Sequence, residues 1–86
     1  MLTKTPLLPP QEREFEVRGD YITLGQLLHA TGMIGTGGEA KFYLGENVVL
    51  VNGVEEDRRG RKLRPGDVVT CPLSVPIRLA AMAEPK

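Results

Sequence analysis

Hydrophobic and charged residues alternate along residues 13–18, where Phe15 and Val17 stand between charged neighbours. A period of two is typical of a strand that buries one of its faces. Gly19 and Asp20 follow, and this pair indicates a turn. The pattern therefore predicts a first strand that ends before residue 20.

The next segment has the pattern of an amphipathic helix. Three leucines share one face at helical spacing: Leu24, Leu27 and Leu28. Thr23 and Gln26 match the capping box, in which each side chain bonds a free backbone amide at the helix start. Gly32 stands where a left-handed residue commonly ends a helix. We therefore expect a first helix that begins after Thr23.

A second helix is predicted from about Gly37 to residue 44 or 45. Thr36 and Glu39 repeat the spacing of the capping box. The predicted inward face consists of Ala40, Tyr43 and Leu44. Gly37 and Gly38 are poor helix formers, which cost about 1 kcal/mol each in a helix interior. Two explanations stay open: they allow an anion such as phosphate to approach the helix start, or they pack tightly against the first helix.

Strand signals dominate the second half of the chain. Residues 48–54 are predicted to form a β-hairpin, because Asn52-Gly53 favours the positive φ angles of a type I′ turn. A charged loop covers residues 55–62, and Leu63 is expected to return to the core. The segment Pro65-Gly66-Asp67 then predicts a turn into the next strand.

That strand is predicted over residues 68–71. Pro72 and Pro76 indicate that the last strand, around residues 75–79, lies at an edge of the sheet. Residues 1–12, which hold three prolines, are expected to be a flexible lead-in. The domain is accordingly placed at residues 13–79, followed by a tail over 80–86.

The composition is that of one ordinary globular domain. The 86 residues are 41% hydrophobic and 26% charged, and no apolar run approaches the roughly 18 residues of a membrane span. The first residues lack the apolar stretch of a secretory signal, so we expect a cytoplasmic protein. Cys71 is the single cysteine and is expected to pack as a small hydrophobe, so neither a disulfide nor a metal site nor a cofactor is predicted. His29 has no nucleophile or acid near it in the sequence, which argues against an enzyme; it either faces solvent or contacts phosphate.

Charge is segregated along the chain although its formal sum is zero. Five of the seven residues from 58 to 64 are basic: Arg58, Arg59, Arg61, Lys62 and Arg64. Arginine suits phosphate because its planar guanidinium forms two parallel hydrogen bonds. The alternative is a solvated loop that the neighbouring Glu55, Glu56 and Asp57 partly neutralise.

Taken in order, these motifs resemble a known RNA-binding module. They are Ile22-Thr23-Leu24-Gly25-Gln26-Leu27-Leu28, Gly37-Gly38-Glu39-Ala40-Lys41, Val48-Val49-Leu50-Val51-Asn52-Gly53, Arg58-Arg59-Gly60-Arg61-Lys62-Leu63 and Pro65-Gly66-Asp67. The chain is similar to the domain named after small-subunit ribosomal protein four, and most similar to its short stand-alone YaaA-like type. The likeness covers roughly residues 13–70.

The resemblance implies an α+β fold of the αL type, with two helices packed on a small, mostly antiparallel sheet that includes a β-hairpin. It also implies a module that binds structured RNA without doing chemistry on it. We further expect a monomer that takes no small-molecule substrate. The residues expected to contact RNA are Thr36, Gly37, Gly38, Lys41, Asn52, Arg58, Arg59, Arg61, Lys62 and Arg64.

Two functional hypotheses follow. The first is binding of ribosomal or transfer RNA through phosphates and backbone shape. The second is a protein-interaction adaptor that presents its basic loop to an acidic partner in ribosome assembly or replication.

Overall fold

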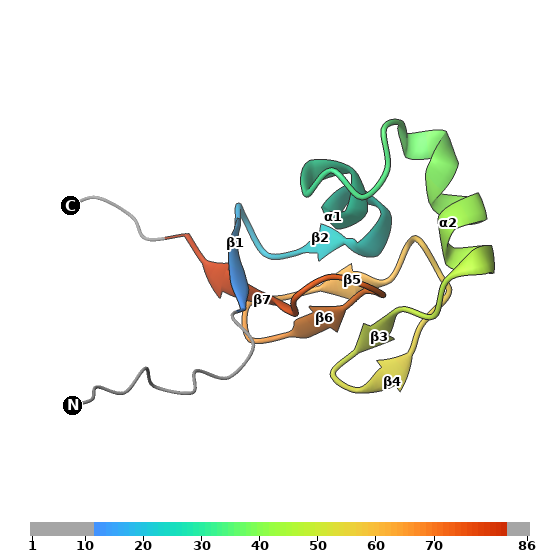
Figure 1. The fold of residues 1–86 in the computed structure, drawn as a ribbon. Helices are drawn as coiled ribbons and strands as arrows, with labels where there is room; N and C mark the ends of the chain where they lie inside the picture. Colours follow the sequence, from blue (N-terminus) through green and yellow to red (C-terminus); the bar gives the residue numbers. More distant parts are fainter. Residues whose placement is uncertain (1–11, 83–86) are drawn as a thin grey trace, which may run out of the picture.

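The computed structural model describes residues 12–82, which form two short helices, one 3₁₀ turn and seven strands (Figure 1). In chain order these are β1 (Arg13–Val17), β2 (Ile22–Thr23), α1 (Leu24–Ala30), η1 (Gly37–Glu39), α2 (Ala40–Glu46), β3 (Leu50–Val51), β4 (Val54–Glu55), β5 (Lys62–Leu63), β6 (Val68–Thr70) and β7 (Ile77–Ala81). The predicted α+β class is confirmed. Predictions for residues 1–11 and 83–86 lie outside the described part.

Five strands form one sheet in the order β1-β7-β6-β3-β4, and β2 pairs with β5 in a separate two-stranded ladder. The pair β1 and β7 is parallel, whereas the other pairs are antiparallel. Figure 1 shows α1 above β2 and β5, with α2 beside α1 and with β1 and β7 at the end away from α2. The helices therefore gather at one end of the molecule, where the loop that leads into β5 also lies.

The hairpin between β3 and β4 forms as predicted. Asn52 has a φ of 54° and Gly53 a φ of 85°, so both turn residues adopt the left-handed conformation of a type I′ turn. Leu50 pairs with Glu55, and Val51 pairs with Val54.

The last strand is not at an edge, so that prediction was wrong. β7 lies between β1 and β6. Pro72 and Pro76 both precede β7, so neither removes a hydrogen bond from the ladder. The carbonyl of Pro76 instead accepts a bond of 2.8 Å from the amide of Arg13, where β1 joins the sheet.

Folded contacts reach slightly beyond residues 13 and 79, the predicted limits of the domain. β7 continues through Ala81, two residues beyond the expected end at 79, because β1 pairs with it along its whole length. At the other end, Glu12 belongs to the folded part, since its carboxylate lies 2.9 Å from a guanidinium nitrogen of Arg78.

The core is formed by apolar side chains from both helices and from the main sheet. Leu24, Leu27 and Leu28, the leucines of the predicted helix face, have no exposed surface. The other buried apolar residues are Val17, Ile34, Ala40, Leu44, Val49, Val51, Leu63, Val69, Cys71, Ile77 and Leu79. The predicted inward face of the second helix is likewise confirmed, with Tyr43 half-buried. Cys71 packs as the small hydrophobe expected.

The start of α1 has the predicted capping box. The amide of Gln26 donates to the hydroxyl of Thr23 at 3.2 Å, and the amide of Thr23 donates to the side-chain oxygen of Gln26 at 2.9 Å. Gly32 follows the helix with a φ of +84°, which glycine adopts without strain. Within residues 12–82, neither helix has the length or the apolar character to cross a membrane.

The second predicted capping box does not form. Thr36 has extended backbone angles at the start of η1, but its side chain makes no capping bond. The carboxylate of Glu39 accepts from the amide of Gly35 at 2.6 Å, one residue before the position that the motif requires. The physical reason is the tighter 3₁₀ turn that Gly37 and Gly38 adopt ahead of α2.

We therefore expect the two threonines to differ in their effect on stability. Thr23→Ala removes a hydroxyl that caps α1, and it should lower the free energy of unfolding by about 1 kcal/mol. Thr36→Ala is the matched control and should change it by much less, because its hydroxyl makes no such bond. Urea unfolding of both variants checks this, and equal losses would contradict the assignment of the caps.

Candidate nucleic-acid interface

The loop between β4 and β5 crosses the N-terminal end of α1. The amide of Leu24 donates to the carbonyl of Arg61 at 2.9 Å, and the amide of Gly25 donates to the carbonyl of Arg59 at 2.8 Å. These bonds satisfy amides that a helix start otherwise leaves free. The backbone of this loop, which we call the basic loop, is therefore fixed against α1.

Gly25 makes this close approach possible. A Cβ atom at this position would lie 3.4 Å from both the Cβ and the carbonyl oxygen of Arg59, and 3.6 Å from the Cβ of Ala40. A methyl group just fits, whereas a longer side chain would push the loop away from the helix. Gly25 thus marks the point where α1, α2 and the loop meet.

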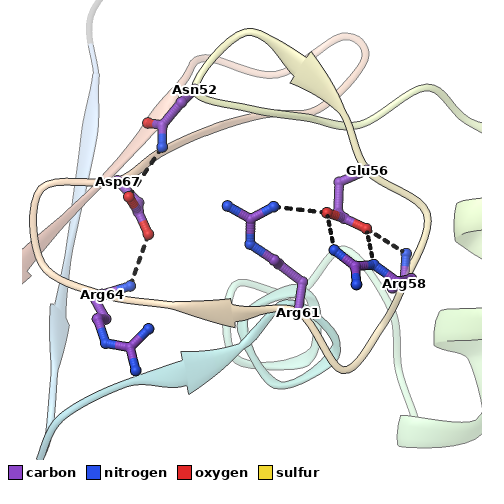
Figure 2. Close-up of polar contacts among 6 residues, drawn as sticks. All are labelled: Asn52, Glu56, Arg58, Arg61, Arg64 and Asp67. Carbon is purple, nitrogen blue, oxygen red and sulfur yellow. Dashed lines mark hydrogen bonds and ion pairs between the residues drawn. The ribbon is translucent and has the colours of Figure 1, made fainter.

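Glu56 organises the arginines of the loop (Figure 2). Its side chain is only 7% exposed. One carboxylate oxygen accepts from the backbone amide of Arg58 at 3.0 Å and from its Nε at 2.9 Å. The other oxygen accepts from Arg58 Nη2 at 3.2 Å and from Arg61 Nη1 at 2.8 Å. One buried anion therefore holds two cations of the loop.

The ionic state of Glu56 follows from these contacts. The side-chain hydrogen bonds of Arg58, joined by those of its backbone amide and of Arg61, lower the pKa of Glu56 to about 2, although burial alone would raise it. The carboxylate is thus charged at neutral pH, and it neutralises one of the two arginines that it binds.

The arginine side chains of the basic loop are consequently less available to an external ligand than the sequence suggested. Arg58 and Arg61 do not simply project into solvent, because each gives part of its guanidinium to Glu56. The side chain of Arg58 nevertheless stays 71% exposed, and that of Arg61 36%. Both retain N–H groups that can bond an external acceptor, since a guanidinium carries five.

Lys62 and Arg64 lie beside an aromatic ring that the sequence analysis did not single out. The Nζ of Lys62 is 5.0 Å from the centroid of the Tyr21 ring, and the Cζ of Arg64 is 5.9 Å from it. Both distances are within the range of cation–π attraction. The pairing of Thr23 with Lys62 in the β2–β5 ladder brings the basic loop to Tyr21.

Two grooves lie along this loop. The first, which we call the helix groove, has a volume of about 450 Å³ and is lined by Thr23, Gly25, Gln26, His29, Gly37, Ala40, Arg59 and Gly60. The second, the arginine groove, has a volume of about 510 Å³ and is lined by Arg58, Gly60, Arg61, Lys62 and Arg64. Gly60 borders both, so the grooves are neighbours on one surface.

The structure therefore brings together most of the predicted site residues. Each of the five basic residues from 58 to 64 borders one of the two grooves, and Gly37 lies in the helix groove with Arg59. His29 also lines the helix groove, where its Nε2 lies 3.2 Å from the carbonyl of Gly35. Thr36, Gly38 and Lys41 are exposed near Gly37 but do not line either groove.

Gly37 and Gly38 are not required for packing. A Cβ atom at either position would meet nothing within 4 Å, and neither residue has a positive φ. The explanation that they pack tightly against α1 is therefore wrong, because Gly25 fills that role. Their backbone stays open to an approaching molecule.

Asn52 lies outside both grooves. Its Nδ2 donates to Asp67 at 3.0 Å (Figure 2). Its Oδ1 accepts from the amide of Val68 at 2.9 Å. Asp67 in turn accepts from the amide of Arg64 at 2.9 Å. The side chain of Asn52 thus joins the hairpin to the turn before β6, which is a structural role.

Comparison with known proteins identifies the family. The family model described as "S4 domain" matches residues 15–78. The chain belongs to the S4 domain family. The resemblance drawn from the sequence motifs is therefore confirmed, and the matched range runs from β1 into β7.

A curated relative is similar over part of the chain. The "Probable ribosome maturation protein RlbA" of Bacillus subtilis (strain 168) is 54% identical over 50 residues, which cover 58% of this chain and 70% of the relative.

The central position of Glu56 in this S4 domain leads to a prediction about acid stability. Its folded pKa of about 2 lies below the ordinary value of 4.5, so the ion pairs stabilise the fold above pH 4.5 and this contribution is lost as the pH falls toward 2. Glu56→Gln should lower the free energy of unfolding by about 1–2 kcal/mol at pH 7 and should weaken its dependence on pH over this range.

The matched control is Glu55→Gln, since Glu55 is an exposed neighbour on β4. It should leave both the stability and its pH profile nearly unchanged. Urea unfolding from pH 7 to pH 2 measures the two profiles. If both variants followed the wild-type profile, the proposed role of Glu56 would be disproved.

Proposed function

We propose that this S4 domain is a non-catalytic module that binds structured RNA, ribosomal or transfer RNA, through phosphate and shape contacts at the helix and arginine grooves. Membership of the S4 domain family supports the proposal. The name of the relative, a probable ribosome maturation protein, favours an RNA of the ribosome.

The observation that carries the proposal is the adjacency of the two grooves at Gly60. One groove supplies cations from the loop, and the other supplies the open glycine backbone before α2. A helical RNA presents rows of phosphates across a wide, shallow minor groove, and proteins recognise it mainly by shape and by phosphate and 2′-hydroxyl contacts. A continuous surface with cations beside uncrowded backbone suits such a target.

The basic side chains of the two grooves should contribute unequally to phosphate binding. Arg59 is the arginine of the helix groove, and its fixed carbonyl anchors it to α1. Lys62 and Arg64 contact the Tyr21 ring, an attraction that leaves their charge intact. Arg58 and Arg61 share the charge of Glu56. We therefore assign the main phosphate contacts to Arg59, Lys62 and Arg64, with Lys41, which is exposed on α2, as a further positive charge.

Binding should consequently depend on salt. If about four groups contact phosphates, the affinity should fall with a log-log slope near −3. Fluorescence anisotropy with a ribosomal RNA fragment and a transfer RNA, at several salt concentrations, measures this slope. Absence of binding at low salt, or binding without salt dependence, would rule out the proposal.

Arg59→Ala should weaken RNA binding and make the slope shallower by about 0.7–0.9, the change expected for one lost phosphate contact. Arg13→Ala is the matched control, because it removes the same charge from β1, at the end of the molecule away from α2 (Figure 1). Equal effects of the two variants would show that the grooves are not the site.

The glycines ahead of α2 allow a test in which one substitution should raise the free energy of unfolding but lower the affinity for RNA. Gly37→Ala should raise the free energy of unfolding by about 0.5–1 kcal/mol, because alanine restricts the unfolded chain and nothing obstructs its methyl group. The same methyl group should weaken RNA binding, since Gly37 lines the helix groove where an RNA backbone would approach. Thermal unfolding and anisotropy together check this, and unchanged affinity would remove Gly37 from the interface.

A further inference from the structure

Tyr21 lies beside two cations of the arginine groove and also lines a third groove, which shares Gln26 with the helix groove. The residue is 42% exposed and connects β1 to β2. Cations of the arginine groove, Lys62 and Arg64, lie 5.0 and 5.9 Å from its ring centroid. Tyr21 also lines a depression of about 410 Å³ between β1 and α1, which we call the aromatic groove.

The walls of the aromatic groove differ from those of the two basic grooves. Phe15 and Tyr21 supply aromatic surface, and Ile22 adds an aliphatic side chain. Glu16, Arg18 and Gln26 border it with polar groups, so one carboxylate and one guanidinium flank its apolar surface. The side-chain oxygen of Gln26 is engaged by the amide of Thr23, so its NH₂ group is the part that remains to donate.

This chemistry fits a nucleobase better than a phosphate. A base stacks on aromatic rings, and its edge carries both acceptors and amino donors. The amide of Gln26 can donate to such an acceptor, and the carboxylate of Glu16 can accept from an amino group. That carboxylate offsets the single charge of Arg18 in this groove, whereas a phosphate finds two cations beside the Tyr21 ring, at Lys62 and Arg64.

We propose that the aromatic groove binds an unpaired nucleobase of an RNA whose backbone lies along the arginine groove. The inference rests on the proposed function, because the cations of that groove must first hold the RNA. The bound RNA is then a helix interrupted by an unpaired nucleotide, such as a bulge, rather than a continuous duplex. Stacking of the unpaired base on Tyr21 is the contact that a bulged helix makes and a continuous duplex does not.

Two hairpin RNAs with the same stem test this, one fully paired and one with a single bulged 2-aminopurine. Wild-type protein should bind the bulged hairpin about ten-fold more tightly, the difference expected for one stacked base, and should quench the 2-aminopurine fluorescence. Tyr21→Ala should abolish both the preference and the quenching, whereas Tyr21→Phe should retain them because it keeps the ring.

Phe42→Ala is the matched aromatic control. Phe42 is 73% exposed on α2 and does not line the aromatic groove, so its variant should keep the ten-fold preference. Circular dichroism establishes that each variant folds. If wild-type protein bound both hairpins equally, with the expected salt dependence, base binding would be disproved while RNA binding would stand. If it bound neither hairpin at low salt, both proposals would fail.

Discussion

The buried carboxylate of Glu56 is the interaction on which the basic surface depends. Like charges in a short loop repel one another, and an arginine-rich loop has no apolar side chains to hold it in place. Glu56 supplies an internal counter-ion that binds Arg58 and Arg61 at 2.8–3.2 Å and is itself almost fully removed from solvent. A charge in such a place is stable only while it is paired, so the loop conformation and the ionisation of Glu56 depend on each other.

The same loop completes the start of α1. Its carbonyls at Arg59 and Arg61 accept from the first amides of the helix, and Thr23 takes the next one. The helix is only seven residues long, too short to persist without tertiary contacts. The loop thus stabilises α1, and α1 in turn fixes the positions of the loop side chains. The ion pairs of Glu56, the hydrogen bonds that cap α1 and the lack of a side chain at Gly25 therefore all act where the basic loop meets the start of α1.

Much of the fold could be predicted from local patterns. The capping box at Thr23, the buried leucines and the Asn52-Gly53 turn each depend on residues close in sequence, and the structure has all of them. The edge assignment of the last strand failed because its parallel partner, β1, lies more than sixty residues away. No local pattern contains that pairing. The capping box at Thr36 failed for a different reason, since the required residue types are present but the 3₁₀ turn moves Glu39 to Gly35.

Sequence reasoning named the residues of the candidate site but not how they are organised. Family motifs pointed to the glycines before α2 and to the basic loop, and the structure places Gly37 and Arg59 in one groove. The burial of Glu56 had no sequence signal, because Glu55, Glu56 and Asp57 look alike in the chain. Tyr21 was missed because its cationic partners lie some forty residues further on. A basic residue close to a tyrosine across a predicted strand pair is the signal that could have revealed it.

The formal net charge of zero has a consequence for recognition. The five cations of residues 58–64 border the helix and arginine grooves, whereas Glu46, Glu55, Glu56 and Asp57 line a separate depression beside β4 and the end of α2. Long-range attraction to a polyanion is therefore weak, because the total charge cancels beyond about one Debye length, roughly 8–10 Å. At shorter range the basic surface attracts an anion while the acidic depression repels it, so a polyanion can approach this domain in few orientations. The proposed RNA binding therefore relies on the fit of this surface rather than on overall charge.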